Sequence, residues 1–105
     1  MMRYTVKITD KALMDMEDIY KYIAEQLHAP HNAISQYNRI SEAIEKLDVF
    51  PERIAIIDSE PECNMGLRMM IVDNYSVFYV VEKDIVIVTR VLYSASDIRE
   101  RLRNK

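Results

Sequence analysis

The stretch VDNYSVFYVVEKDIVIVTRVLYSASD, residues 72–97, decides the fold. Within it, residues 75–81 and 84–93 are rich in β-branched and aromatic side chains, as is the run LRMMIVD at 67–73. Such a composition is typical of strands. Turns of only two or three polar residues, 73–74 and 82–84, join one run to the next, and connections this short join antiparallel neighbours. The stretch therefore predicts three strands of one antiparallel sheet.

The two turns determine which residues of these strands face each other. Residues 73–74 predict one turn and residues 82–84 predict the other. If 82–84 forms a three-residue turn, Arg90 stands opposite Ser76 on the neighbouring strand. The last strand is apolar on both faces at 85–88, which favours a central place in the sheet.

The first half of the chain predicts one strand and a helix hairpin. RYTVKIT, residues 3–9, alternates apolar and polar side chains, as a strand with one buried face does. Thr9 can then cap a helix that ends before Pro30. The apolar stripe of this helix has helical spacing and consists of Ala12, Met16, Ile19, Ile23 and Leu27.

Pro30 suits the first turn of a second helix. Its apolar stripe consists of Ala33, Tyr37, Ile40, Ile44 and Leu47. Two helices joined by a few residues form an antiparallel hairpin, which ends here at Phe50-Pro51. The helical tyrosines Tyr20, Tyr22 and Tyr37 are expected to pack rather than to bind a partner.

These elements predict an α+β fold that forms a single domain over residues 1–105. An antiparallel helix hairpin packs on one face of a mostly antiparallel sheet of about four strands, because both layers have one apolar face to bury. The first strand can join the sheet beside the last, and the helices would allow a parallel crossover. Ser94 or Ser96 can cap a short C-terminal helix.

Composition narrows the classes of function. The chain has 105 residues, a net charge of −3 and one cysteine, Cys63, which is expected to be a free loop thiol in a reducing cytosol. The first ten residues lack the apolar run of a secretory signal, and no run approaches the ~18 apolar residues of a membrane span. His28 and His31 are too few ligands for zinc. A cytoplasmic protein without membrane, metal or cofactor is therefore expected.

The chain resembles the RelE/ParE superfamily of type II toxin–antitoxin toxins, which includes plasmid stabilisation proteins. The likeness is carried by ITDKALMDMEDIYKYIAEQLHAP at 8–30, IEKLDVFPER at 44–53 and GLRMMIVDNYSVFYVVEKDIVIVTRVLYSASD at 66–97. It extends from Tyr4 to about Asp97. The resemblance implies a small cytoplasmic toxin that arrests growth and is neutralised by a cognate antitoxin encoded beside it.

The superfamily divides by target. ParE-like members inhibit DNA gyrase, whereas RelE-like members cut ribosome-bound mRNA without a metal and use basic residues to do so. The cutting branch places an arginine directly after the aromatic residue that opens the third strand, and an arginine or lysine just beyond the last strand. In this chain those positions are Ser76 and residues 94–96, SAS. Serine lacks the charge and donor fork of arginine, so the resemblance favours the gyrase-inhibiting branch.

Two alternatives stay open. One is a RelE-like mRNA endoribonuclease whose candidate catalytic residues are Arg68, Arg90 and Tyr93. Both arginines lie in apolar strands, where an unpaired charge is costly, so each must reach solvent, a carboxylate or a ligand. The other alternative is a degenerate member that binds its antitoxin without being toxic. Association of the chain with itself, or with the antitoxin in a hetero-oligomer, is open in each case.

The antitoxin is expected to bind as an extended or helical segment over apolar surface near the helix hairpin and a sheet edge. The net charge of −3 argues against a mainly electrostatic attachment and against broad nucleic-acid binding. Residues 94–105 nevertheless carry four basic and two acidic side chains. This basic tail is expected to add a modest contact to an acidic segment.

Overall fold

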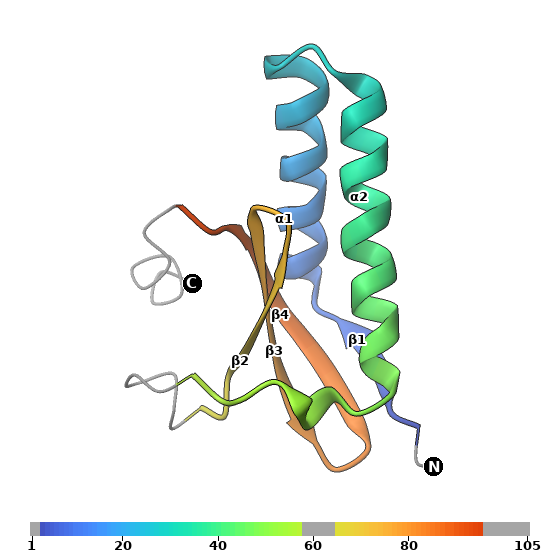
Figure 1. Cartoon of the computed structure of the whole chain (residues 1–105), viewed down its shortest axis with the longest axis vertical. Coiled ribbons are helices and arrows are strands. Elements are labelled where there is room, and N and C mark those ends of the chain that lie inside the picture. Colours follow the sequence, from blue (N-terminus) through green and yellow to red (C-terminus); the bar gives the residue numbers. More distant parts are fainter. Residues whose placement is uncertain (1–2, 58–64, 96–105) are drawn as a thin grey trace.

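The structure, a computed structural model, describes residues 3–57 and 65–95. Helices precede most of the strands along the chain (Figure 1). The elements are β1 (Thr5–Ile8), α1 (Asp10–Lys21), the π-helical turn η1 (Tyr22–Gln26), α2 (Pro30–Glu45), the 3-10 turns η2 (Lys46–Asp48) and η3 (Pro51–Arg53), β2 (Arg68–Val72), β3 (Tyr75–Glu82) and β4 (Ile85–Tyr93). The predicted C-terminal helix and Cys63 lie outside the described residues.

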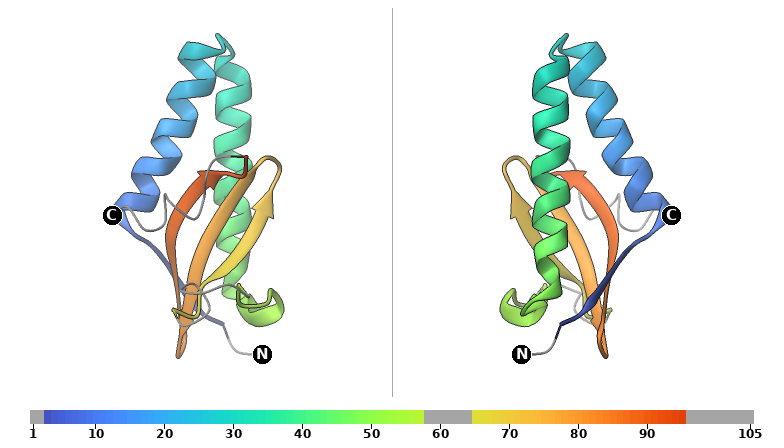
Figure 2. Two further views of the ribbon diagram at one scale, coloured as in Figure 1. Left: turned by 90° about the vertical axis from the view of Figure 1, so that its left-hand side faces the viewer. Right: turned by 90° about the vertical axis from the view of Figure 1, so that its right-hand side faces the viewer.

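The strands form one sheet in the order β1-β4-β3-β2, and the helices form a layer against it. β4 is central, as its two apolar faces predict. It pairs in parallel with β1, from Thr5 opposite Ile85 to Ile8 opposite Val88, and antiparallel with β3. Both helices lie on the same side of this sheet (Figure 2). The predicted α+β architecture, a helix hairpin on one face of a mostly antiparallel sheet, is confirmed.

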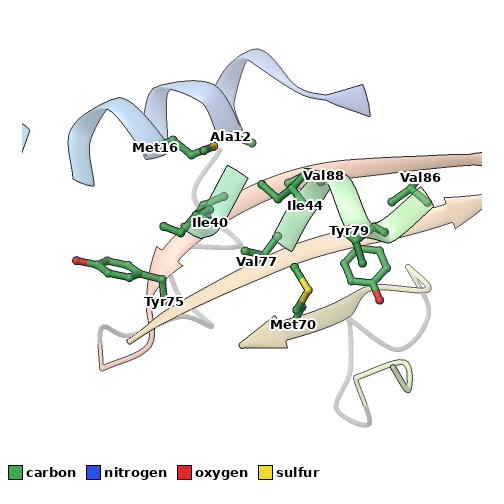
Figure 3. Packing of buried hydrophobic residues seen from close by; sticks show 12 residues of the cluster. Ala12, Met16, Ile40, Ile44, Met70, Tyr75, Val77, Tyr79, Val86 and Val88 are labelled. Carbon is green, nitrogen blue, oxygen red and sulfur yellow. The ribbon is translucent and has the colours of Figure 1, made fainter. Parts of the chain in front are cut away.

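The main core lies between the helices and the sheet (Figure 3). The core follows from the spacing of apolar residues in the sequence. Every second residue of a strand and every third or fourth residue of a helix point to the same face, and these two apolar faces pack together. The helices contribute Ala12, Met16, Ile40, Ile44 and Leu47, and the strands contribute Met70, Tyr75, Val77, Tyr79, Val86, Val88 and Val91. Tyr75 lies at one end of this core, where α1 meets the ends of β3 and β4.

A smaller cluster occupies the opposite face of the sheet. Leu67, Phe78 and Leu92 are almost completely buried there, and Ile57 and Met69 pack against them. Ile71, on the same face of edge strand β2, is by contrast 56% exposed. The face away from the helices is therefore partly covered and partly open.

Thr9 caps α1 and also ties it to β4. Its hydroxyl oxygen accepts a hydrogen bond from the Ala12 N–H at 3.1 Å and donates one to the Thr89 carbonyl at 3.1 Å. Asp10 lies in the first turn, where the helix dipole favours an anion. The prediction that Thr9 caps α1 is thus confirmed, and its hydrogen bond to Thr89 also connects the helix to the sheet.

Thr9→Ala is expected to lower the free energy of unfolding by about 1–2 kcal/mol, because both hydrogen bonds are lost and the cap is removed. Thr9→Ser keeps both groups and serves as the matched control. Urea unfolding followed by circular dichroism measures both variants. Equal stability of the alanine and serine variants would contradict the two-sided role of this hydroxyl.

The first helix changes its pitch before it ends. In η1 the Leu27 N–H donates to the Tyr22 carbonyl at 3.2 Å, a spacing of five residues. A π turn holds more residues than an α turn, so side chains beyond it rotate away from the buried stripe. Ile23 is still buried, but Leu27 and Tyr22 are each 55% exposed. The predictions that Leu27 continues the buried stripe and that Tyr22 packs are both wrong.

Within residues 3–57 and 65–95, no helix is long and apolar enough to cross a membrane.

Candidate functional site

The prediction that Arg90 lies opposite Ser76 is wrong. The turn after β3 contains two residues rather than three, and a bulge at Thr89 adds one residue to β4. Each change moves the register by one position, so Arg90 pairs with Phe78 and Ser76 pairs with Leu92. Cross-strand pairing therefore does not bring the guanidinium of Arg90 to Ser76.

Arg90 instead forms a nearly buried ion pair with Asp15 of α1. Its Nε donates to Asp15 Oδ2 at 2.7 Å, and its Nη2 donates to Oδ1 at 3.0 Å. Asp15 Oδ2 also accepts the backbone N–H of Val91 at 3.0 Å. β1 pairs with β4 only as far as Val88, so Val91 lies beyond the part of β4 that β1 covers. The Asp15 carboxylate accepts the N–H of Val91 there. The expectation that Arg90 reaches solvent, a carboxylate or a ligand is confirmed, and its partner is the carboxylate of Asp15.

Arg68 is the first residue of β2, pairs with Tyr79 of β3 and points toward η3. Its Nη1 donates to the carbonyl oxygens of Ile54, at 2.5 Å, and Glu52, at 3.4 Å. Nη2 is 3.9 Å from the Glu52 carboxylate. Burial raises the pKa of neighbouring Tyr79, although the charge of Arg68 opposes that shift. The hydroxyl of Tyr79 donates to the Pro51 carbonyl at 2.6 Å. These contacts link β2 and β3 to η3.

Tyr93 ends β4 beside Tyr75. The two ring centroids are 5.8 Å apart and the ring planes are inclined at 60°. Tyr93 is 49% exposed, whereas Tyr75 is buried. Burial raises the pKa of Tyr75, and the neighbouring hydroxyls of Tyr93 and Tyr22 raise it further. The three tyrosines therefore gather at one end of the sheet.

The three candidate catalytic residues do not converge. Arg68 pairs with Tyr79 and Tyr93 pairs with Tyr75, so four residues of β3 separate their positions. At ~3.3 Å per residue this is about 13 Å along the strand. Arg90 is directed to α1 by its ion pair with Asp15. Such separation is larger than the hydrogen-bond reach that acid–base partners of one reaction need.

Ser76 and Ser94 lie at the two places where the resemblance to the cutting branch leads us to expect cations, after the aromatic residue that opens β3 and in the segment 94–96, and they do come together. Ser76 Oγ and Ser94 Oγ are 2.8 Å apart and share a hydrogen bond. The Ser94 N–H also donates to the Asn74 carbonyl at 2.9 Å, which fixes this residue against the turn between β2 and β3. Two neutral hydroxyls thus satisfy each other at this point.

A cavity of about 470 Å³ opens between the α1–η1 segment and the ends of β3 and β4. Its walls combine aromatic, aliphatic and acidic side chains, namely Asp15, Asp18, Ile19, Tyr22, Leu27, Asn74, Tyr75, Val91, Leu92 and Tyr93. We refer to it as the tyrosine cavity.

Sequence reasoning missed most of this cavity. Asp15 lies at the flank of the α1 stripe, next to Met16, and the need of Arg90 for a carboxylate was the signal that could have identified it. Tyr22 and Leu27 carried no such signal, because a regular helix would turn Leu27 toward the core. Among residues 3–57 and 65–95, no three His, Cys, Asp or Glu side chains lie close enough together to hold a metal ion.

The family follows from a comparison with known sequences. Residues 6–98 match the family described as the ParE toxin of type II toxin–antitoxin systems, parDE. The match spans most of the chain, so the protein belongs to this family and is a toxin of the ParE/RelE class. No curated protein matched the chain by sequence.

Solved structures share the same fold at low sequence identity. A chain of the chromosomal ParDE system of Pseudomonas aeruginosa superposes with a TM-score of 0.72 at 23% identity, covering 87% of this chain and 96% of that one. A mutant of the Escherichia coli toxin RelE in the free state gives 0.64 at 14% identity, covering 98% of each chain. The RelBE2 toxin–antitoxin complex of Mycobacterium tuberculosis gives 0.62 at 18%, covering 87% and 98%.

Proposed function

We propose that this toxin arrests growth by inhibiting DNA gyrase, that it cuts no RNA, and that a cognate antitoxin neutralises it in the cytoplasm. The family match to ParE over residues 6–98 supports the proposal. The observation that carries it is the hydrogen bond between Ser76 and Ser94. The resemblance implies that the cutting branch would carry cations directly after the aromatic residue that opens β3, where Ser76 stands, and in the segment 94–96, which begins with Ser94. Neither hydroxyl can neutralise the charge that develops on a phosphoryl group in the transition state.

The remaining cations support the same conclusion. Arg90 is held by both oxygens of Asp15, and Arg68 donates to backbone carbonyls of the segment around η3. A guanidinium that turned toward RNA would leave Asp15 as a nearly buried carboxylate without its partner, which is strongly unfavourable. Both arginines therefore favour a structural role over a catalytic one.

The RelE-like alternative remains defined by Arg68, Arg90 and Tyr93 as candidate catalytic residues. Tyr93 favours it most, since its side chain is 49% exposed at the end of β4. The hydroxyl of such a tyrosine could exchange a proton with a reacting ribose. A toxin-like module that binds the antitoxin without arresting growth is the third possibility.

Pulse labelling after induction separates the three functions. We expect thymidine incorporation to fall before methionine incorporation, because gyrase inhibition stops replication first. In vitro, the purified chain should block ATP-dependent supercoiling of relaxed plasmid by gyrase and leave ribosome-bound mRNA intact. An early fall in methionine incorporation, with codon-specific mRNA cuts that Tyr93→Phe abolishes, would establish the RelE-like alternative. Growth without arrest would indicate the non-toxic module.

The outer edge of β2 supports the proposed antitoxin partner. In the described part of the chain, β2 pairs with β3 on one side and meets only the isolated bridge between Ile56 and Arg68 on the other. Ile56 and Ile71 are 41% and 56% exposed. An exposed apolar edge strand is a template for a partner segment, so co-expression of the neighbouring reading frame should restore growth.

A further inference from the structure

The tyrosine cavity is lined by polar and acidic side chains as well as by apolar ones. Tyr22, Tyr75 and Tyr93 line it from three different elements, and two aspartates, Asp15 and Asp18, stand beside them. Phenol rings present a negative face and a hydroxyl oxygen that accepts hydrogen bonds. Its volume of about 470 Å³ is within the range of pockets that hold ligands.

The two aspartates differ in how their charge is compensated. The charge of Asp15 is neutralised by Arg90, and its oxygens already accept three hydrogen bonds. Asp18 is exposed on α1, and no hydrogen bond or ion pair within the described residues engages its carboxylate. Among the described residues, the lining of the cavity therefore combines one carboxylate without an ion-pair partner and three aromatic rings.

A cation on a planar group matches these walls best. A guanidinium stacks on tyrosine rings and donates two parallel hydrogen bonds to a carboxylate. Its aliphatic stem can lie along the exposed side chain of Leu27, which lines the cavity. A purely aliphatic side chain would instead desolvate Asp18 without pairing it, which is unfavourable.

We propose that the tyrosine cavity receives an arginine side chain of the antitoxin, with Asp18 as its ion-pair partner and the three tyrosines as its aromatic walls. This inference rests on the proposal that an antitoxin neutralises the chain. In this proposal, one arginine of the antitoxin binds in the tyrosine cavity and anchors that partner to the toxin. The charge of Asp18 and the tyrosine rings, rather than buried apolar area, would then determine that the bound side chain is an arginine.

Binding of a small probe tests the cavity directly. N-acetyl-arginine amide is titrated into the full-length protein, and the ring resonances of Tyr22, Tyr75 and Tyr93 are followed by NMR. N-acetyl-citrulline amide, which has nearly the same shape without the charge, is titrated in parallel. We expect saturable shifts with the arginine probe and binding of the citrulline probe that is about fivefold weaker or more.

Two variants test the role of the charge. Asp18→Asn is expected to abolish the preference for arginine over citrulline. Glu17→Gln removes the same charge one residue away on α1, in a side chain that does not line this cavity, and should keep the preference. Equal binding of both probes to the wild type, no shift with either probe, or equal loss of the preference in both variants would overturn the proposal.

A third variant separates the antitoxin from the basic tail of the chain itself. If full-length protein with Arg99, Arg101 and Arg103 replaced by glutamine binds the arginine probe and the wild type does not, the tail is the occupant and the proposal is wrong. These titrations require neither gyrase nor growth arrest. Their failure would therefore leave the proposed toxin function intact, and a negative labelling experiment would leave the probe result intact.

Discussion

Replacing Arg90 by alanine is expected to lower the free energy of unfolding by about 3–5 kcal/mol, because it leaves Asp15 as an uncompensated charge in a nearly buried place. The side chains of Arg90 and Asp15 are only 13% and 9% exposed. Urea unfolding of the variant and the wild type, followed by circular dichroism, gives the difference. A loss this large is comparable to the whole stability of a weak domain, so the variant should unfold at markedly lower urea concentration.

A second ion pair between helix and sheet supplies the matched control. Arg39 of α2 bonds Asp73 at 2.6 Å, but the side chains are 62% and 28% exposed. Because solvent screens this pair, Arg39→Ala should cost only about 0–1 kcal/mol. A cost of Arg90→Ala that does not exceed the cost of Arg39→Ala would contradict the structural role of Arg90, and would restore Arg90 as a candidate for catalysis.

Phe78→Ala is expected to cost about 3–5 kcal/mol as well, although Phe78 lies on the face of the sheet that points away from α1 and α2. Its side chain is completely buried in the cluster with Leu67 and Leu92. Removing the ring would leave a cavity between these neighbours. Ile71→Ala on the same face is the control, with an expected cost below about 1 kcal/mol because Ile71 is mostly exposed.

Thermal and urea unfolding of the two variants decide this prediction. If both substitutions cost less than about 1 kcal/mol, the second face contributes little to stability, and the core between helices and sheet carries nearly all of it. If Ile71→Ala is as costly as Phe78→Ala, β2 depends on its outer side chains more than their exposure indicates.

The regular parts of the fold could be predicted from the sequence because their periods are unambiguous. The alternation in residues 3–9 is compatible only with a strand. The apolar stripes of α1 and α2 are compatible only with helices. The short turns required β2, β3 and β4 to be antiparallel neighbours. The doubly apolar segment of β4 predicted its central place, which the sheet order confirms.

The irregular parts could not be predicted, and they determine the site. The bulge at Thr89 and the π turn at η1 each add one residue to a regular element, and local sequence gives little indication of either. The bulge, together with the two-residue turn after β3, moves Arg90 away from Ser76, and the π turn brings Leu27 to the surface. Arg68, Arg90 and Tyr93 each satisfy a sound local criterion, but their positions relative to one another depend on the turn length and the bulge that set the strand register.

The parallel pairing of β1 with β4 has a consequence for how the protein matures during synthesis. Thr5 and Ile85 are partners, so 80 residues of translation separate them, roughly 4–16 s at 5–20 residues per second. The helix hairpin can form early from local contacts, but the strand with which β1 pairs, β4, leaves the ribosome much later. The sheet of a nascent chain of this toxin thus remains incomplete until β4 has been synthesised, and premature termination before β4 would release an inactive product.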